Sequence, residues 1–295
     1  MILRDLINEI LIKIIESIES IQKIEQNESI IKRKKIVNTH FTPISNKQYH
    51  YVINSIRLYF IEQGLIECCS QDKFPILSSC DESFKPTHQF YLEYELLQND
   101  SVTGYFCVNN LNKEHTNSIP TVEFVINGDI TVLEIFVRDL LVYLCYHNIS
   151  KYNIKDYVYI TDKLNTHVNY LSNTVKQKIY TKFGAVFLLK NYPFNTPVHW
   201  TIKDNVANKT HNKLVAILSG YESIISYEIS SNKNDMRNRF DSMSYNTCLG
   251  DSEEINRELE QYLSQSFKTR SYGKIFTLEI ILSMIKERLI PDSFL

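Results

Sequence analysis

The order of apolar and polar positions predicts two helices in the N-terminal part of the chain. Between residues 2 and 36, apolar side chains recur every three or four positions with Glu and Lys between them, which predicts one long amphipathic helix. Such a helix either binds a partner or packs on its own domain. A second helix is predicted from about Lys47 to Gln63, because Gly64 is a typical residue after a helix end. The apolar positions of the first helix are Ile7, Ile10, Leu11, Ile14, Ile15, Ile18, Ile21 and Ile24.

The middle of the chain combines short β-branched and aromatic runs with two helical patterns. The helices are predicted over Thr131–Asn148 and around Asn169–Phe183. Two strands, Val102–Val108 and Thr121–Ile126, follow each other directly and are predicted to form an antiparallel hairpin with a long loop. The other predicted strands are Leu65–Cys69 with Lys73–Ser78, then Tyr91–Leu97 after a loop that begins at residue 80, Tyr157–Thr161 and Ala185–Leu189.

The stretch Lys213–Met284 carries the clearest succession of elements. An apolar run ends on Gly220, and a second strand pattern follows it. A charged loop is predicted over Asn232–Phe240 and a polar helix over Glu253–Ser266, and Phe267–Met284 predicts a strand that runs into a helix. Runs of strands with helices before and after them favour an α+β fold with a mostly antiparallel sheet over a regular βαβ alternation.

Composition narrows the class of protein. The chain has 43% hydrophobic and 22% charged residues, which is typical of a globular protein, and its net charge of −2 argues against a nucleic-acid partner held by charge. The six cysteines show no metal-binding spacing and indicate reduced thiols in a cytoplasmic protein. The first residues carry Arg4, Asp5 and Glu9 rather than a signal peptide, and no apolar run is long enough to span a membrane. No repeat or linker divides the chain, so we expect an N-terminal helix (residues 1–38) and one main domain (residues 39–295).

Three segments in the first half of the chain resemble the motifs of a known class of enzymes. Ile56–Glu67, followed by Pro75, is similar to motif 1 of the class II aminoacyl-tRNA synthetases, in which a helix, a glycine turn, a strand and a proline form the dimer interface. Leu111–Glu114 stands in the place of the FRxE sequence of motif 2. Val122–Asp129 stands where the aspartate/asparagine branch carries the next strand of that motif. The resemblance implies a homodimer formed through motif 1.

The C-terminal third carries the most specific resemblance. Asn191–Lys203 resembles the segment NFPxxxSPFWNMK, and the sequence from Gly220, GYESIISYEIS, resembles GMETIGSAERS. NDMRNRF, which begins at Asn234, resembles DEMRExF, and Phe267–Met284 matches motif 3, FxPRYGGGIGMTRMIRAM, without a gap. This series, over residues 47–290, is similar to the archaeal-type asparagine synthetases, which descend from the catalytic core of aspartyl- and asparaginyl-tRNA synthetases. The resemblance implies a class II fold, an antiparallel sheet flanked by helices.

The resemblance also implies a reaction that activates a carboxylate. In that family, ATP and aspartate give an aspartyl-adenylate, and ammonia then attacks it to leave asparagine and AMP. Such chemistry needs cations on the triphosphate, carboxylates that hold Mg²⁺, and a cation on the carboxylate of the substrate. An active enzyme would therefore bind ATP, Mg²⁺ and an amino acid.

Several positions keep the residue type that the family uses. Glu222 matches the carboxylate on the metal and phosphate side, and Glu114 matches the glutamate that holds the adenine amino group. Lys113 and Lys274 are candidates to replace lost arginines at the phosphates, although Lys274 also suits a solvated surface. Trp200 either lines the substrate pocket or belongs to the core. The other candidate positions are Glu123 and Ser226 on the substrate side, Glu228 and Arg270 among the catalytic residues, and Arg237 in the charged loop.

At several other positions this chain differs from the family, and the resemblance implies that the family residues there contact an anion or the nucleotide. The arginine of GSAERS, which grips the side-chain carboxylate of the substrate, falls on Ile229. The motif 3 arginine falls on Glu279 and the motif 2 arginine on Asn112, and two glycines fall on Ile225 and Phe276. A glutamate repels a nearby triphosphate. The loss of one anion-stabilising group costs about 3 kcal/mol of transition-state stabilisation.

Two functions are compatible with this pattern. In the first, the fold survives and the ancestral reaction is lost or altered, so that the chain acts as a dimer, a partner-binding protein or a small-molecule sensor without a cofactor. In the second, it remains an ATP-dependent ligase with a changed carboxylate substrate. Aminoacylation of tRNA is disfavoured, since no anticodon-binding domain precedes the motifs. Glu222 and Glu228 are either a residual metal or ligand site or strand-end acids paired with Lys or Arg.

Overall fold

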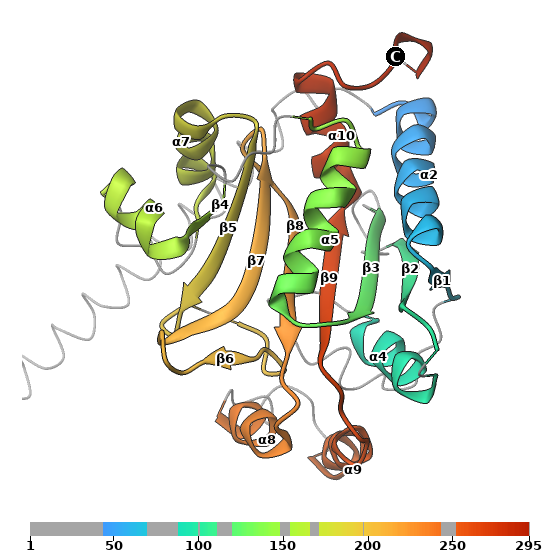
Figure 1. The fold of residues 1–295 in the computed structure, drawn as a ribbon, viewed down its shortest axis with the longest axis vertical. Coiled ribbons are helices and arrows are strands. Elements are labelled where there is room, and N and C mark those ends of the chain that lie inside the picture. The colour runs from blue at the N-terminus through green and yellow to red at the C-terminus, as the bar shows by residue number, and fades with distance from the viewer. Residues whose placement is uncertain are drawn as a thin grey trace, which may run out of the picture. The chain divides into compact units, whose positions relative to one another are not determined.

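Within the described residues, nine strands form one mixed sheet, which is the framework of the chain between Ser45 and Leu295 (Figure 1). The computed structural model describes residues 44–69, 88–99, 101–110, 120–147, 154–165, 171–196, 198–242 and 252–294. The strands lie in the order β1-β2-β3-β9-β8-β7-β5-β4, and β6 pairs with β7. They are β1 (Leu65–Glu67), β2 (Gly104–Asn110), β3 (Pro120–Asn127), β4 (Ile154–Asp156), β5 (Val186–Pro193), β6 (Asp204–Asn205), β7 (Thr210–Leu218), β8 (Tyr221–Ile229) and β9 (Arg270–Phe276).

The centre of the sheet is antiparallel, as the sequence predicts. Every pair from β2 to β5 along the sheet is antiparallel, and only the two edge pairs, β1–β2 and β4–β5, are parallel. The predicted hairpin is confirmed, because β2 and β3 pair in register from Gly104 opposite Ile126 to Asn110 opposite Pro120. The predicted α+β class, with a mostly antiparallel sheet flanked by helices, is therefore confirmed.

Helices cover both faces of the sheet. On one face, which we call the α5 face, α5 (Ile130–Tyr143) and α10 (Thr277–Lys286) lie in front of the central strands in Figure 1, with α2 (Asn46–Glu62) beside them. On the other face, the α7 face, α7 (Asn173–Phe183) packs on β5, β7 and β8. Ile225 of β8 packs against the cluster formed by α6 and α7, whereas Glu228, which points to the other face of the strand, accepts a hydrogen bond from Ile130 at the start of α5, so α5 and α7 lie on opposite faces. All residues of β7 are buried, as expected for a strand covered on both sides.

The α7 face carries two separate covers. Tyr227 packs with residues of α4 (Gln89–Gln98), whereas Ile225 packs against the cluster that α6 (Tyr157–Leu164) and α7 form with β5 and β7. Tyr227 and Ile225 are alternate residues of β8 and therefore point to the same face. The two covers thus lie side by side on one face of the sheet, and β8 passes beneath both.

The ends of the helices follow from local sequence. Asp129 precedes α5 and accepts hydrogen bonds from the backbone N–H groups of Thr131 and Val132, at 2.9 and 3.1 Å. Ser45 and Gln48 form a reciprocal capping box at the start of α2. The helix ends before Gly64, whose φ of 78° is a conformation that glycine adopts without strain, so the predicted end is confirmed.

Two segments predicted as strands are helices, and one predicted as a loop is a helix. Tyr91–Leu97 lies in α4, where Leu92 and Leu96 are buried one helical turn apart, and Tyr157–Thr161 lies in α6, where Tyr157 and Ile160 are buried three residues apart. Asn232–Phe240 mostly forms α8 (Lys233–Ser242), and Asn232 accepts hydrogen bonds from the first turn of the helix.

The remaining predicted elements of the C-terminal half are confirmed, and two segments lie outside the described residues. The polar helix is α9 (Ser252–Leu263), and β9 runs directly into α10, as the sequence predicts. A short 3-10 helix at Asp292–Phe294 ends the described chain. The predicted N-terminal helix and the segment Lys73–Ser78 lie outside the described residues.

Candidate ligand site on the central strands

The sheet is open to solvent between the two covers of the α7 face. Ile225 lies in the middle of β8, which has β9 on one side and β7 on the other, yet its side chain is only partly buried. Its partial exposure shows that the described helices do not cover this part of β8 completely. The stretch of sheet around Ile225 is therefore a place where a ligand could reach the central strands, and we call it the open stretch.

Glu222 lies at one side of the open stretch and is paired with a lysine of α7. Its carboxylate is 2.9 Å from Lys176 Nζ, and both side chains keep some exposure. The charge of Glu222 also contributes to raising the pKa of Tyr157 and of Tyr192, for which burial is the larger cause. Glu222 thus faces the cluster of α6 and α7, and its negative charge is balanced by Lys176.

Glu123 and Lys274 lie on the other side of the open stretch and face each other across β3 and β9. Their charged groups are 2.8 Å apart, and both side chains are almost fully buried. Glu123 also accepts hydrogen bonds from Tyr272 Oη at 3.0 Å and from the backbone N–H of His88 at 2.8 Å. The structure therefore brings these two predicted site residues together, as an ion pair beside the open stretch.

Arg270, predicted as a catalytic residue, is instead held in a buried network under α4. Its guanidinium is 2.5 Å from the carboxylate of Glu93, and both side chains are completely buried. Tyr262 donates a hydrogen bond to the same carboxylate at 2.8 Å, and Gln89 donates one at 2.7 Å. Burial lowers the pKa of Arg270, but Glu93 outweighs that effect, so the pKa is raised and the guanidinium stays charged. This arrangement is suited to fixing α4 and α9 to the sheet.

Glu228 does not converge with Glu222. Its carboxylate is 2.6 Å from Lys203 Nζ and accepts hydrogen bonds from Asn212 Nδ2 at 2.8 Å and from the backbone N–H of Ile130 at 3.2 Å. Ile130 is the first residue of α5, so Glu228 serves that helix on the opposite face of the sheet from Glu222. The two carboxylates cannot hold one metal ion together.

Three further candidate residues lie in packed surroundings. Ile229 is buried beneath α4 in an apolar cluster that includes Leu92 and Ile202. Trp200 is buried and stacks on Phe90, with ring centroids 5.6 Å apart. Ser226 is buried and donates a hydrogen bond to the backbone carbonyl of Leu214, its neighbour on β7. None of these three side chains reaches the solvent at the open stretch.

Lys113 and Glu114, predicted to bind the nucleotide, lie outside the described residues, as does Asn112. In the part of the chain that the structure describes, no group of three His, Cys, Asp or Glu residues could hold a metal ion. A bound Mg²⁺ would therefore depend on Glu222 together with groups of its ligand. Among the same residues, no helix is long and apolar enough to cross a membrane.

The sequence did not single out two polar residues of β7, Lys213 and His211. Lys213 is buried beside Tyr192, with Nζ 4.6 Å from the centre of the ring. In the sequence Lys213 follows the polar residues Thr210, His211 and Asn212 and precedes the apolar run Leu214–Leu218, so no signal in the sequence marks it as buried. His211 Nδ1 lies 2.7 Å from Asp204, which also binds Arg239 of α8 at 2.6 Å.

His211 makes the stability of the domain depend on pH. Burial lowers its pKa from the ordinary value of 6.5, and Arg239 and Lys213 add to this, while Asp204 opposes it. The folded state therefore disfavours a proton that the unfolded chain takes up near pH 6.5, so stability falls as the pH drops below that value. We expect the free energy of unfolding, measured in urea between pH 7 and pH 5, to fall less in His211→Gln than in the wild type. Equal slopes would show that His211 does not titrate in this range.

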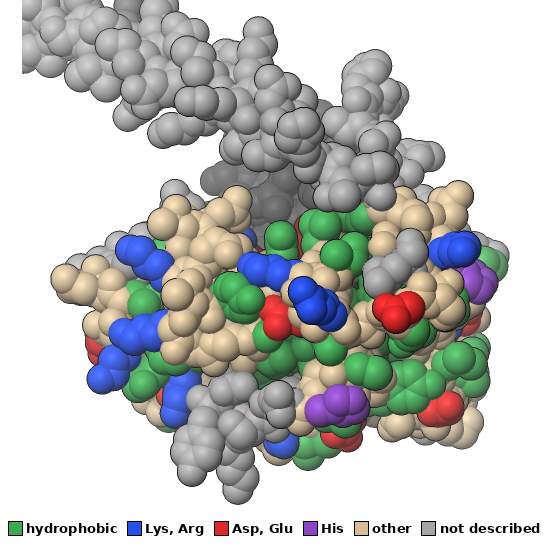
Figure 2. All heavy atoms as spheres, turned by 90° about the horizontal axis from the view of Figure 1, so that it is seen from above, with side chains coloured by type: hydrophobic (Ala, Val, Ile, Leu, Met, Phe, Trp, Pro, Cys, Tyr) green, Lys and Arg blue, Asp and Glu red, His purple; other side chains and the backbone are tan. Residues whose placement is uncertain are grey.

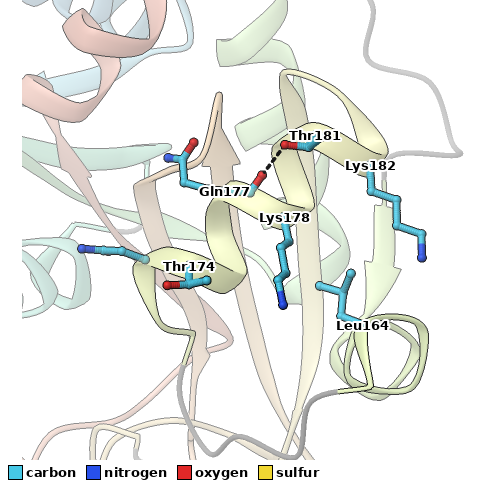
Figure 3. A pocket seen from close by; sticks show the side chains of 7 residues that line it. Leu164, Thr174, Gln177, Lys178, Thr181 and Lys182 are labelled. Carbon is cyan, nitrogen blue, oxygen red and sulfur yellow. Dashed lines mark hydrogen bonds between the residues drawn. The ribbon is translucent and has the colours of Figure 1, made fainter.

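A shallow groove lies on the outer side of α7, away from the open stretch (Figure 3). Its volume is about 660 Å³, and Lys178, Lys182 and Leu164 are among the residues that line it. Val175 and Ile179, on the opposite side of the same helix, pack against the sheet. Seen from above, Lys and Arg side chains gather over the side of the domain that carries α6 and α7 (Figure 2). Two lysines thus contribute to the groove, and Ile225 is not among the residues that line it.

Solved structures share this arrangement of strands and helices. No model of a protein family matches the sequence, and no curated protein matches it. The chain is similar in structure to the aspartyl-tRNA synthetase of Entamoeba histolytica, with a TM-score of 0.60 and 11% identity over 81% of this chain and 55% of that one. It is equally similar to the asparaginyl-tRNA synthetase of Entamoeba histolytica in complex with asparaginyl-adenylate (TM-score 0.61, 11% identity, 81% of this chain and 63% of that one).

A third similar structure is the asparaginyl-tRNA synthetase of Pyrococcus horikoshii complexed with asparaginyl-adenylate. Its TM-score is 0.60 at 13% identity, over 81% of this chain and 64% of that one. The chain thus spans less than two-thirds of the length of each of these synthetases. The domain has the fold of the class II catalytic core found in aspartyl- and asparaginyl-tRNA synthetases.

Proposed function

We propose that this chain is a class II synthetase-like paralogue, related to the archaeal-type asparagine synthetases, in which the ancestral activation and amidation of aspartate is lost or altered. The observation that carries the proposal is the burial of Ile229. The position at which the resemblance places the grip on the aspartate side chain is occupied by an apolar residue sealed beneath α4. A carboxylate brought there would lose its hydration and meet no cation from residue 229, which is strongly unfavourable.

The other changed positions support the same conclusion. Arg270 keeps its charge but is fully engaged with Glu93, so it is not available to a nucleotide. Glu279, in the first turn of α10, brings a negative charge to the place where the resemblance puts an arginine along ATP. Each change weakens the binding of an anion, and together they remove the main electrostatic support for an adenylate-forming transition state.

The alternative is an active ATP-dependent ligase with a changed carboxylate substrate. Lys274 lies beside the open stretch, where it could meet a phosphate if Glu123 released it, and Lys213 adds a second buried cation on the same face. In that case the cofactors are ATP and Mg²⁺, with Glu222 as the metal-side carboxylate. If the reaction is lost, no cofactor is needed.

Isothermal titration with ATP and Mg²⁺ separates these two cases. We expect no heat of binding at millimolar ATP, because Asn112 and Glu279 stand where the resemblance places arginines and Lys274 is paired with Glu123. Binding followed by release of pyrophosphate that depends on an added amino acid would establish the ligase and overturn the loss of activity. A chemically denatured sample supplies the baseline for heats of dilution.

We also propose that the protein is a cytoplasmic homodimer that associates through the segment resembling motif 1. Three large apolar side chains on α2 and β1 support this: Leu58 is 53% exposed, Ile61 is 56% exposed and Ile66 is 46% exposed. Among the described strands, β1 is also the edge of the sheet, which favours pairing with another chain. A second copy would cover both the apolar side chains and the strand edge.

Replacing Ile61 by Glu is expected to convert the dimer into a monomer. The change places one charge in each half of the proposed interface, and the core is expected to stay intact because Ile61 is 56% exposed. The mass in solution is measured by size-exclusion chromatography with light scattering at micromolar concentration. Lys178→Glu, on the outer side of α7, is the matched control and should remain dimeric. A monomeric wild type would contradict the proposal.

A further inference from the structure

The groove on the outer side of α7 presents two lysine amines to the solvent. Lys178 and Lys182 line it, and the side chain of Leu164 lies between them in the view of Figure 3. Within the described residues, neither lysine forms an ion pair. Lys182 Nζ donates a hydrogen bond to the backbone carbonyl of Lys163 at 3.1 Å, which holds this amine beside the end of α6. The two lysines therefore offer positive charge to a ligand from outside the domain.

The surroundings of the groove favour a ligand with negative charge. No acidic side chain lines the groove, and its remaining members carry hydroxyl or amide groups. The elements β4, α6 and α7 together contain five lysines and two aspartates, although the whole chain has a net charge of −2. One of these lysines, Lys176, is paired with Glu222 and faces the sheet. An excess of positive charge remains on the outer side, where it attracts an anion. The hydroxyl and amide residues of the lining are Asn173, Thr174, Gln177 and Thr181.

The spacing of the two lysines indicates the shape of the ligand. They are four residues apart in α7, so their backbone positions are separated by about 6 Å along the helix axis. In an extended peptide, side chains two residues apart point to the same side and are separated by about 6–7 Å. Two acidic side chains at alternate positions of an extended peptide therefore match Lys178 and Lys182.

A nucleic acid fits this groove less well than a peptide does. It is held by many phosphate contacts, whereas the groove offers two lysines. The exposed carboxylate of Asp162 on α6 and the slight negative charge of the whole chain would also repel a polyanion. A peptide brings few charges, and its backbone N–H and C=O groups can form hydrogen bonds with the hydroxyl and amide groups of the lining.

We propose that the groove binds an extended acidic segment of a partner protein. Lys178 and Lys182 bind carboxylates at alternate positions of the segment, and its backbone runs over Leu164. The inference is independent of the proposed function, because none of the residues that line the groove is a candidate site residue on the sheet. The contacts are exposed ion pairs, so binding is reversible and weakens as salt is added.

The test is isothermal titration of the full chain at low salt with three peptides of equal length. Acetyl-Gly-Glu-Ala-Glu-Gly-amide has its acids at alternate positions, acetyl-Gly-Glu-Glu-Ala-Gly-amide has them adjacent, and acetyl-Gly-Gln-Ala-Gln-Gly-amide has none. We expect the first peptide to bind about tenfold more tightly than the uncharged one, because two exposed ion pairs together are worth about that factor. It should also bind more tightly than the peptide with adjacent acids, whose side chains point to opposite sides.

Two double variants test the role of the lysines. Lys178→Gln with Lys182→Gln should remove the preference for the acidic peptide. Lys178→Glu with Lys182→Glu should transfer the preference to a peptide in which both glutamates are replaced by lysine. Lys209→Gln, which changes an exposed lysine in the turn between β6 and β7, is the matched control and should leave the preference unchanged. Thermal melting curves check that the variants fold.

Equal affinity of the wild type for the acidic and the uncharged peptide would overturn the inference, as would a preference that survives in the double glutamine variant. Absence of binding at millimolar peptide, or equal affinity for alternate and adjacent acids, would contradict it as well. A single-stranded oligodeoxythymidylate is titrated in parallel. If it bound more tightly than the acidic peptide and lost affinity in the double glutamine variant, the groove would be a phosphate-binding surface and the peptide proposal would be wrong.

Discussion

Replacing Glu93 by Gln is expected to lower the free energy of unfolding by about 3–5 kcal/mol, which is the cost of leaving one partner of a buried ion pair uncompensated. Arg270 is completely buried and lies 2.5 Å from the Glu93 carboxylate. Gln cannot supply the negative charge, and α4 prevents water from replacing it. Because a domain of this kind is stable by only about 5–15 kcal/mol, the loss is a large fraction of the total.

Urea unfolding followed by tyrosine and tryptophan fluorescence measures this change. Arg57→Met is the matched control, because it breaks an ion pair with Glu67 that is about one-third exposed on each side, and it should cost less than about 1 kcal/mol. The double variant Glu93→Leu with Arg270→Met should lose less than the single variant, since neither charge remains buried. A loss below about 1 kcal/mol for Glu93→Gln would show that Arg270 reaches water or another anion, as a catalytic residue would.

Replacing Ile229 by arginine is expected to destabilise the domain and not to confer aspartate binding. Ile229 is buried among apolar residues and lies directly opposite Arg270 across β8 and β9. The new guanidinium would be desolvated beside a like charge, so we expect the free energy of unfolding to fall by more than about 4 kcal/mol or the chain to remain unfolded.

Ile229→Val is the control for this prediction, because it removes one methyl group and should cost about 0.5–1.5 kcal/mol. Both variants are compared with the wild type by urea unfolding and by titration with aspartate. If Ile229→Arg folded as stably as the wild type and bound aspartate, the pocket for the side chain of the substrate would have to be open at position 229. The account of Ile229 as a core residue would then be wrong.

The central sheet could be predicted from the sequence because its strands are long and their apolar residues are continuous. β7 and β8 meet at Ser219 and Gly220, and Gly220 adopts a φ of 88°, so the residue type and the turn agree. Two short helices, α4 and α6, were predicted as strands because their amino-acid composition favours strands whereas the structure forms helices. α4 is rich in aromatic and leucine residues, which is typical of strands, but Gln89 and Glu93 lie one turn apart and bond to each other only in a helix.

The candidate site was predicted less well than the fold, because the type of a charged residue does not show whether a neighbouring residue neutralises its charge. The resemblance pointed to Glu222 and Glu228 as one site, but β8 contains a register shift between Ala216 and Ile217 of its partner strand, and the two carboxylates face opposite sides. It also pointed to Arg270, whose partner Glu93 lies far away in the sequence. Lys213 went unnoticed because it stands at the polar beginning of β7, after Thr210, His211 and Asn212, where a lysine is ordinary.

The domain has the class II fold, and several of its charged residues hold helices in place. Glu93 and Arg270 stabilise α4, and Glu228 stabilises the start of α5. Arg270 and Glu228 match positions that the resemblance assigns to catalysis, and Glu93 contacts Arg270. Around Ile225, where the described helices leave the sheet partly open, Lys274 lies directly opposite Ile225 and is paired with Glu123.

The most direct test of this account is the exchange of radioactive pyrophosphate into ATP in the presence of aspartate and Mg²⁺. Formation of an aspartyl-adenylate is reversible, so an active site of the ancestral kind would incorporate label at a rate that depends on aspartate. We predict no incorporation above the rate measured without amino acid. Exchange that depends on aspartate, accompanied by asparagine when ammonia is added, would contradict the proposal that the ancestral reaction has been lost or altered.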